Sequence, residues 1–392
     1  MKQVKGRLVP KLRFKEFVSD GNLENEKIGN LCKITTGKLD ANAMVENGQY
    51  RFYTCAKDYY FIDKYAFDTE ALLISGNGAN VGYIHYYKGK FNAYQRTYVL
   101  DQFTQDIFFI KYYLERNLSK RIATEKKDGN TPYIVLSSIS EMAVMLPKDK
   151  KEQQKIADCL SSLDELIETE DKKLEALQRH KKGLMQELFP SEGQTLPKRR
   201  FREFNHDGDW EEKKLGDICE ILNNRRQPIS SNNREKGQYP YYGASGIVDY
   251  VKDYIFDERL VLVGEDGAKW GSNEKTAFIA EGKYWVNNHA HVLKPIQIND
   301  VLLINFLVMT DLKPFITGAA PPKLTLGKLK TISIPLPRNS QEQEEKSKLE
   351  QQKIADCLSS VDDLITSQEQ KIDALKTHKK GLMQQLFPNP DN

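Results

Sequence analysis

Polar residues suited to nucleic-acid contact lie in or near the loops between short predicted strands. In the second half of the chain these residues are Asn223, Asn224, Arg225, Arg226, Lys269, Asn288, His289 and Lys323. Arginine can bond guanine edges or phosphates, and asparagine and glutamine can pair with an adenine edge. A comparable set in the first half is Lys33, Lys38, Lys57, Asn77, Asn80, Gln95 and Arg96. We interpret both sets as candidate nucleic-acid contacts, with a solvated surface side chain as the alternative for each residue.

Signatures of catalysis or cofactor binding are missing from the sequence. Residues 76–82 (GNGANVG) lack the spacing of a dinucleotide-binding loop, and the segment after them is typical of a strand, so we predict a tight turn between strands. The chain has no Walker A sequence, no Asn-Pro-Pro-aromatic motif of adenine methyltransferases and no nuclease carboxylate–lysine cluster. His289 and His291 have no third metal ligand nearby, which favours a loop or strand-edge role. We therefore expect a noncatalytic chain that binds no cofactor or metal itself.

The helices that must position these loops occur twice. Residues 151–190 and 349–388 align at an offset of 198 without a gap, and 27 of the 40 aligned positions are identical. In both copies the core positions, most of them apolar, alternate at spacings of four and three, which is the a/d seam of a coiled-coil helix. The apolar seam residues are Ile156, Leu160, Leu163, Ile167, Leu174, Leu177, Leu184 and Leu188, and then Ile354, Leu358, Val361, Ile365, Ile372, Leu375, Leu382 and Leu386.

Two seam positions are polar in both copies of the repeat. They are occupied by Glu170 and Lys181 in the first copy and by Gln368 and Lys379 in the second. A polar residue in a seam costs stability but can fix the register and the choice of partner. The alternative is a generic helical face from which the lysine stems extend outward. Each helix is predicted to end at Phe-Pro, because proline cannot continue a helix.

The repeat continues outside the helices. The segment PKLRFKEF (10–17) matches PKRRFREF (197–204), and residues 76–79 match residues 265–268. Gln95-Arg96-Thr97-Tyr98 falls where the second half has Asn-His-Ala-His at 288–291. These landmarks keep their order while the residues between them differ greatly. We infer two units that share a fold and differ where a surface would touch a partner.

Each unit is predicted to be mixed α/β (α+β). Short β-rich runs are separated by Gly, Asn and Asp turns, at 50–55, 71–75, 81–87 and 97–100, and again at 260–263, 276–280 and 291–293. One helix follows in each unit, at 106–120 and 300–310, opened by an Asp that can act as N-cap or first-turn charge. The length of 392 residues fits two domains of roughly 150 residues plus the connecting helices.

Composition excludes several classes of protein. The net charge of +3 and the pI of 8.3 do not describe a nonspecific polycation, so positive charge must act locally. The mean hydropathy of −0.61 and the shortness of the apolar runs argue against a membrane protein, because a span needs about 20 residues. The five cysteines form no CxxC pair, which is typical of reduced residues in a cytosolic protein. We expect a cytoplasmic location.

The chain resembles the specificity subunit of type I restriction–modification systems over essentially its whole length. The residues of this resemblance are the two helical repeats, PKLRF-EF at 10–17, W-x-x-x-x-LGDI at 210–218, NNHAHVL at 287–293 and the Leu-Pro pairs at 146–147 and 336–337. The first half departs from the family pattern at Leu23, where tryptophan is usual. It departs again at 95–98, where Gln-Arg-Thr-Tyr replaces Asn-His-Ala-His.

The resemblance implies two target recognition domains, at 1–150 and 191–340, each reading one half of an asymmetric, bipartite site in double-stranded DNA. The two helices, at 151–190 and at 341–392 with its tail, would pack as an antiparallel coiled coil and set the spacing between half-sites. Two modification subunits would bind this scaffold, hold S-adenosylmethionine and methylate adenine. Two restriction subunits, motor-nucleases that use ATP and magnesium, would complete a complex that cleaves unmodified DNA.

Helix length is compatible with a spacing role. About 33 helical residues at ~1.5 Å per residue give roughly 50 Å, and one turn of B-DNA is roughly 34–36 Å. Two alternatives come from other classes: a noncatalytic coiled-coil adaptor that joins proteins without reading DNA, and a self-sufficient methyltransferase. The adaptor does not explain why polar loops diverge between two matched units, and the methyltransferase would need the cofactor loop and catalytic motif that the sequence lacks.

Overall fold

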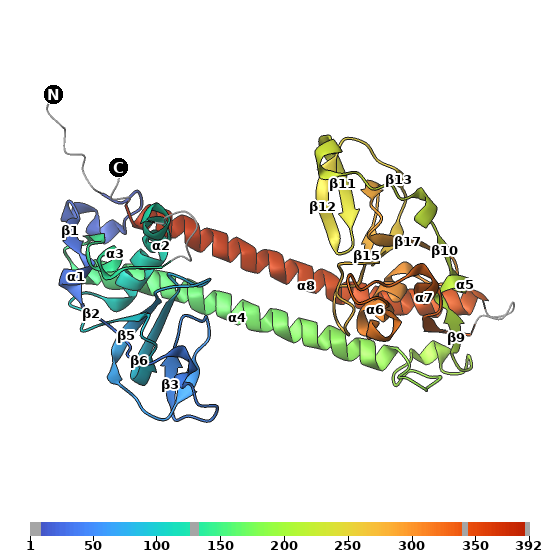
Figure 1. Cartoon of the computed structure of the whole chain (residues 1–392), viewed down its shortest axis with the longest axis horizontal. Helices are drawn as coiled ribbons and strands as arrows, with labels where there is room; N and C mark the ends of the chain where they lie inside the picture. The colour runs from blue at the N-terminus through green and yellow to red at the C-terminus, as the bar shows by residue number, and fades with distance from the viewer. Residues whose placement is uncertain (1–8, 126–132, 339–343, 389–392) are drawn as a thin grey trace. The chain divides into compact units, whose positions relative to one another are not determined.

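The chain divides into two compact units, which share two long helices. The computed structural model describes residues 9–125, 133–338 and 344–388. Unit 1 comprises Met1–Asp171 with Gln370–Asn392, and unit 2 comprises Lys172–Glu369. Both boundaries fall inside long helices, α4 (Lys150–Leu188) and α8 (Glu344–Leu386), so each unit contains a part of both (Figure 1).

The main sheet of unit 1 has the strand order β2-β7-β5-β6-β3-β4, antiparallel except for the parallel pair β3 and β6. A separate antiparallel ladder joins β1 to β8. The elements before α4 are η1 (Lys15–Asp20), β1 (Glu24–Lys27), α1 (Ile28–Leu31), β2 (Lys33–Thr36), η2 (Ala41–Ala43), β3 (Tyr50–Tyr53), β4 (Tyr60–Ile62), β5 (Phe67–Ser75), β6 (Ile84–Ala93), β7 (Thr97–Asp101), α2 (Ile107–Glu125), α3 (Leu136–Ser140) and β8 (Ala143–Leu146).

The core of unit 1 forms where apolar strands meet helix α2 and the long helices. Leu72, Ile74 and Leu100 of the sheet are fully buried against α2. The sequence predicted an Asp at the start of this helix, and the Asp106 carboxylate accepts the amide of Phe109 at 2.8 Å. Because α8 ends in this unit, its apolar C-terminal residues complete the same core.

Unit 2 has a similar strand order, but it is divided between two four-stranded sheets where unit 1 has one six-stranded sheet. Its sheets have the orders β10-β17-β14-β15 and β12-β11-β16-β13, and β9 pairs with β18 as β1 pairs with β8. The elements before α8 are η3 (Arg202–Phe204), β9 (Glu211–Lys214), α5 (Leu215–Ile218), β10 (Cys219–Ile221), η4 (Asn223–Arg225), η5 (Ser231–Asn233), β11 (Lys236–Gly243), β12 (Gly246–Val251), β13 (Phe256–Asp257), β14 (Leu260–Gly264), β15 (Ala277–Ala280), β16 (Lys283–Val286), β17 (Ala290–Pro295), α6 (Asp300–Met309), η6 (Lys313–Phe315), α7 (Leu326–Lys330) and β18 (Ser333–Leu336).

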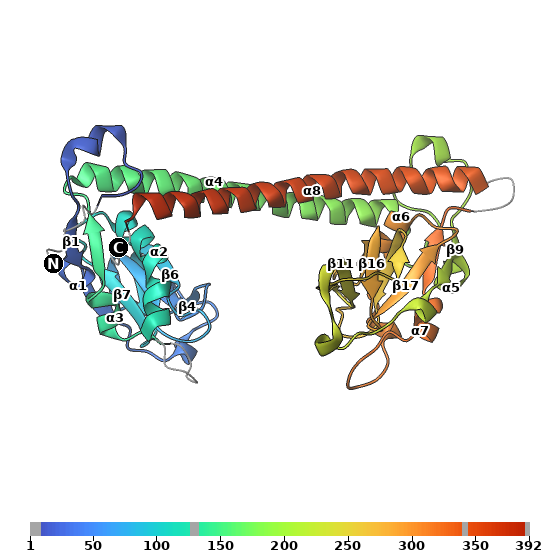
Figure 2. The same cartoon turned by 90° about the horizontal axis from the view of Figure 1, so that it is seen from above.

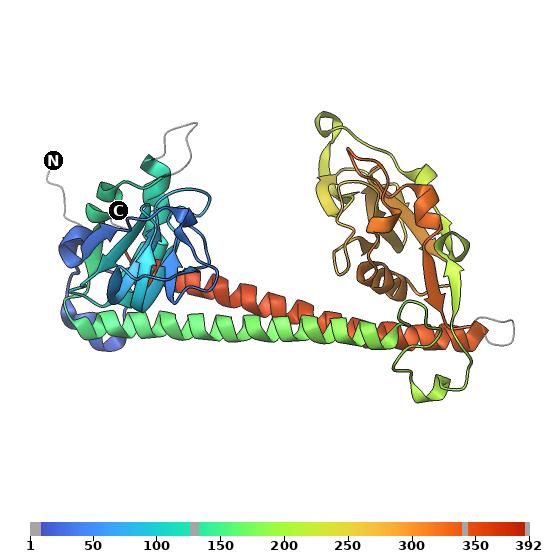
Figure 3. The ribbon, with the colours of Figure 1, turned by 60° about the horizontal axis from the view of Figure 1, so that its bottom comes forward.

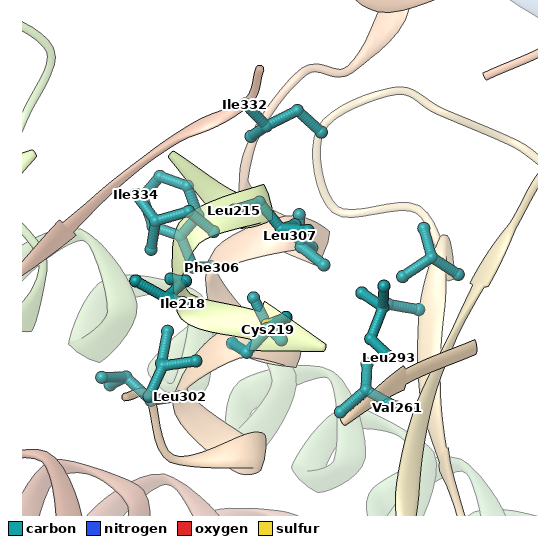
Figure 4. Packing of buried hydrophobic residues seen from close by; sticks show 14 of the residues in the cluster. Leu215, Ile218, Cys219, Val261, Leu293, Leu302, Phe306, Leu307, Ile332 and Ile334 are labelled. Carbon is teal, nitrogen blue, oxygen red and sulfur yellow. The ribbon is translucent and has the colours of Figure 1, made fainter. Parts of the chain in front are cut away.

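Helix α6 is the centre of the unit 2 core. It lies between the strands and the long helices (Figures 2 and 3). Leu302, Phe306 and Leu307 of α6 pack with the strand residues Val261 and Leu293 (Figure 4). The same cluster includes apolar residues from the end of α4 and the start of α8, so the core ties the sheet to the helices.

The predicted strands and helices occur in the structure, but their ends differ from the predicted ones. The predicted strand at 81–87 is wrong at its start, because β6 begins at Ile84. The Val81 amide instead donates to the Gly78 carbonyl at 3.2 Å, and Gly82 has a φ of +83° that suits a turn. At the helix predicted for 300–310, Asn299 is the N-cap and Asp300 supplies the first-turn charge. The helix predicted for 106–120 extends to Glu125.

Within each unit the parts of α4 and α8 run antiparallel. In unit 1, Lys379 bonds Asp164 at 2.5 Å and Lys371 bonds Glu170 at 2.6 Å. In unit 2, Lys181 bonds Asp362 at 2.8 Å. The two lysine seam residues therefore bond carboxylates on the facing helix instead of extending into solvent. All sixteen predicted apolar seam residues are buried or partly buried.

A buried arginine anchors the start of each long helix to the segment that precedes its unit's sheet. The Arg13 guanidinium bonds both carboxylate oxygens of Glu152, at 2.8 and 2.7 Å, with side chains only 6% and 1% exposed. In unit 2, Arg200 bonds Glu350 in the same way, at 2.7 and 2.8 Å. Arg13 and Arg200 belong to the repeated segments at 10–17 and 197–204, so these anchors explain why those segments recur.

Among the helices that the structure describes, none combines the length and the apolar character that a membrane span requires.

We predict that Glu152→Gln destabilises the chain by about 3 kcal/mol or more, because it leaves the buried Arg13 charge without its ionic partner. Urea unfolding of the full chain measures this. The control is Glu141→Gln, whose partner Lys27 is 56% exposed, and its cost should stay below about 1 kcal/mol. Equal losses for the two variants would contradict the anchoring role of Arg13.

Candidate nucleic-acid interface

Three segments of unit 2 meet at a glycine turn between β14 and β15. The Glu265 amide donates to the His289 carbonyl at 2.8 Å, and the Leu324 amide donates to the Glu265 carbonyl at 2.8 Å. Gly267 has a φ of +69°, a conformation that glycine adopts without strain. We call this arrangement the turn site of unit 2, made of residues 265–267, 288–290 and 323–324.

Unit 1 has the same turn site, made of residues 76–78, 95–97 and 133–134. The Gly76 amide donates to the Arg96 carbonyl at 2.9 Å, and the Ile134 amide donates to the Gly76 carbonyl at 2.7 Å. Asn77 forms an isolated β-bridge with Tyr133, as Asp266 does with Lys323. Asn77, Arg96 and Tyr133 therefore occupy the positions of Asp266, His289 and Lys323.

An acidic residue holds two basic residues together in the turn site of unit 2. The Asp266 carboxylate bonds His289 and also Lys323, the latter at 3.0 Å. Asp266 is buried, whereas the side chains of His289 and Lys323 are 50% and 42% exposed. Burial acts to raise the pKa of Asp266, but the hydrogen bonds from Lys323 and His289 outweigh it and hold the pKa below its ordinary value. The site thus presents to solvent the Lys323 ammonium group, which can donate, and the His289 ring, whose Nδ1 already bonds Asp266.

Asn223, a predicted base contact, is used internally. Its Oδ1 accepts the Val292 amide at 2.9 Å, so its Nδ2 is the donor to His291 Nδ1 at 2.9 Å. His291 then carries its proton on Nε2 and donates it to the Leu324 carbonyl at 2.7 Å. Tyr98 makes the equivalent bond in unit 1, from its hydroxyl to the Ile134 carbonyl at 3.0 Å.

The two predicted arginines of unit 2 are also engaged within the chain. Arg226 bonds Glu265 at 2.7 Å and the carbonyls of Ala290 and Asn288 at 2.8 and 3.3 Å. Arg225 bonds Glu258 at 2.7 Å, with its guanidinium 4.5 Å from the centre of the Phe256 ring. Arg226 therefore links two segments of the turn site, and Arg225 lies against a strand. The remaining predicted residues of this unit, Asn224, Lys269 and Asn288, are exposed.

Some of the predicted DNA-contact residues of unit 1 bond other parts of the chain, and others are exposed. Asn80 donates to the Cys55 carbonyl at 3.0 Å, and Gln95 donates to Asp40 at 3.1 Å. Asn77 is partly buried in the turn site. Four predicted cations are exposed on this unit, namely Lys33, Lys38, Lys57 and Arg96.

Sequence reasoning missed Tyr133 and Asp266 as members of the turn sites. Tyr133 is 57% exposed although its ring is large and apolar. The available signal was the alignment of the two halves, which places Tyr133 opposite Lys323, after Pro132 and Pro322. Within the described ranges, no group of three or more His, Cys, Asp or Glu side chains is arranged to hold a metal ion.

A sequence model of the type I restriction modification DNA specificity domain matches residues 21–179 and 207–377, one match in each half. The EcoDI specificity subunit of Escherichia coli is 33% identical over 231 residues, which cover 53% of this chain and 51% of that subunit. A putative type I restriction enzyme specificity subunit of Haemophilus influenzae is 39% identical over 130 residues, 33% of each chain. The chain thus spans about half of the first relative and a third of the second.

Two solved structures share the fold. The type I restriction–modification S subunit from M. genitalium aligns with a TM-score of 0.63 at 19% identity, covering 97% of this chain and 99% of that one. A chain from a study of complex assembly and conformational transition of the type I R-M system aligns with a TM-score of 0.52 at 13% identity, covering 93% and 97%. At such identities the likeness concerns the fold alone.

We predict that His291→Tyr, which installs the residue of unit 1, removes a pH dependence of stability. Burial lowers the pKa of His291, which is 1% exposed. Below about pH 6.5 the unfolded chain therefore takes up a proton that the folded chain does not. The wild type should lose stability relative to the variant by up to about 1.4 kcal/mol per pH unit as the pH falls from about 7 to 5. Urea unfolding of both proteins at several pH values measures this. The prediction is contradicted if their unfolding free energies change with pH in parallel.

Proposed function

Because the chain belongs to the type I restriction–modification DNA specificity family, we propose that it selects the DNA sequence on which a methylating and restricting complex acts. Each unit recognises one half of an asymmetric, bipartite site in double-stranded DNA. One observation supports this most directly: the two turn sites have the same backbone bonds but expose different side chains. The two units share one fold but expose different polar groups at the turn site, which suits the recognition of two different half-sites.

The proposed base-reading groups are those that the turn sites expose. In unit 2 these are Lys323, whose ammonium group suits the acceptors of a guanine edge, and His289, whose Nδ1 bonds Asp266 and whose Nε2 can accept a hydrogen bond from a base. In unit 1 the corresponding exposed groups are Arg96 and Tyr133, with the partly buried Asn77 in the same turn site. Further proposed contacts are Gln95 and Asn288, which belong to the turn sites, and the exposed residues Lys33, Lys38, Lys57, Asn224 and Lys269 outside them. Arg226 and Asn223 position the turn and do not read bases.

The chemistry of the complex belongs to partner subunits, because specificity subunits are noncatalytic. We place S-adenosylmethionine on two modification subunits that methylate adenine, and ATP and magnesium on two restriction subunits. The long helices bind the partners and set the distance between half-sites. The reciprocal bonds Lys181–Asp362 and Lys379–Asp164 support this role, since they fix the register of one helix against the other.

The adenine methylome of a methylation-deficient host tests the proposal. The host expresses this chain with its modification subunit. We expect a single new bipartite motif that is methylated on both strands and disappears when this chain is omitted. If both proteins are soluble and copurify but no motif appears, the adaptor function replaces the DNA-reading function.

We predict that replacing residues 20–147 with another recognition domain of the family changes one half-site only. Unit 1 contains its own core and its own turn site, so its side chains alone should determine the bases that it contacts. Methylome sequencing of the chimera gives the new motif. A change in both half-sites would refute separate recognition by the two units.

We predict that four residues inserted into α4 lengthen the gap between half-sites and leave their sequences unchanged. Four helical residues add about 6 Å, close to the rise of two base pairs. The methylome again gives the motif. The matched control is four residues inserted at Gly193, in the exposed segment after α4, which should keep the gap. An unchanged gap in the α4 variant would exclude a spacing role for the helix.

A further inference from the structure

A pair of tyrosines with a lysine above one ring occurs once in each unit. In unit 1 the rings of Tyr50 and Tyr65 meet edge to face with centroids 5.0 Å apart, and Lys90 Nζ lies 4.8 Å from the Tyr65 centroid. In unit 2, Tyr239 and Tyr254 meet at 5.1 Å, and Lys283 Nζ lies 4.7 Å from the Tyr254 centroid. The ring planes are inclined at 62° and 61°, so the two arrangements agree in detail.

The strand register shows that these are equivalent positions. Strands β3 and β6 are parallel with Arg51 beside Phe91, which places Tyr50 beside Lys90. Strands β11 and β16 are parallel with Tyr241 beside Trp285, which places Tyr239 beside Lys283. Tyr65 and Tyr254 each lie two residues before the phenylalanine that opens the next strand, so all three residues of the group correspond.

Neither group is part of a core. Tyr65 and Tyr254 are 45% and 40% exposed, and both lysines are exposed. Asp68 and Asp257 lie opposite the lysines on the neighbouring strands. Even so, no ion pair of Lys90 or Lys283 occurs among the residues that the structure describes. Both ammonium groups are held by a tyrosine ring and keep their charge available to a partner.

The residues next to the tyrosine–lysine groups differ between the units, whereas the groups themselves are the same. The position two residues before the lysine is Lys88 in unit 1 and Glu281 in unit 2, a reversal of charge. The residue after the first tyrosine is Arg51 in unit 1 and Pro240 in unit 2. An exposed group that stays the same on a diverging surface points to a partner that both units share.

A duplex offers the two units different bases but the same backbone. Side chains that read bases must differ between two half-sites, whereas side chains that bond phosphates need not. Lysine ammonium groups and tyrosine hydroxyls both donate hydrogen bonds to phosphate oxygens. The tyrosine ring holds the ammonium group in place before DNA arrives, so less side-chain freedom is lost on binding.

We propose that Tyr65 with Lys90, and Tyr254 with Lys283, form two equivalent contacts to the phosphodiester backbone of duplex DNA. This inference rests on the proposed function, because it requires that both units bind one duplex. The contacts add affinity without sequence preference and orient each unit on its half-site.

The test uses the full chain with its modification subunits and the double variant Lys90→Gln, Lys283→Gln. Binding is measured at several salt concentrations to a duplex with the motif from the methylome and to an unrelated duplex. Each lost phosphate contact lowers the slope of log affinity against log salt by about 0.9, so the slope should fall by about 2. At about 0.15 M salt, affinity should drop roughly 30-fold for both duplexes, with their ratio and the methylated motif unchanged.

Lys88→Gln is the matched control, because Lys88 is exposed on the same strand but bonds Glu70 at 3.4 Å and has no counterpart in unit 2. It should keep the slope. A double variant that keeps the wild-type slope overturns the inference, and so does one that changes the sequence of a half-site. If the wild type binds both duplexes equally and methylates no motif, the proposed function fails and this inference fails with it.

Discussion

The backbone hydrogen bonds that join three segments at each turn site are the constraint on which the rest of the structure depends. They are made by amide and carbonyl groups of the residues at 76 and 96, and at 265 and 289, and not by side chains. A site joined in this way keeps its backbone bonds when its exposed side chains change, since each residue offers the same donor and acceptor. The exposed residues can then differ without loss of the fold, as Arg96 and His289 do.

The sheets and helices beneath these bonds supply rigidity. Each turn site follows a buried central strand, β5 or β14. The sheet of that strand packs on helix α2 or α6, which in turn packs on parts of α4 and α8. The buried Arg13–Glu152 and Arg200–Glu350 pairs fasten the beginning of each unit to the beginning of a long helix. Side chains for recognition therefore extend from fixed elements, which lowers the cost of ordering them on binding.

The duplicated fold and the helical seam were predictable because their signals are local. Identity between 151–190 and 349–388 and the spacing of four and three can be counted in the sequence. The orientation of single loop residues was not predictable, because it depends on distant partners. Asn223 bonds Val292 and His291, and Arg226 bonds Glu265, so both were candidate contacts that the fold uses internally. The Arg13–Glu152 pair spans 139 residues and left no local pattern.

The seam lysines and the aspartates that they bond have a consequence for the origin of the chain. Lys181 bonds Asp362, and Lys379 bonds Asp164, and each copy of the repeat contains one lysine and one aspartate of this kind. The surface of one copy is thus complementary to itself, as in a symmetric dimer interface. Duplication of a single ancestral sequence would have produced two helices with complementary surfaces at once. Two unrelated surfaces would not have had to adapt to each other.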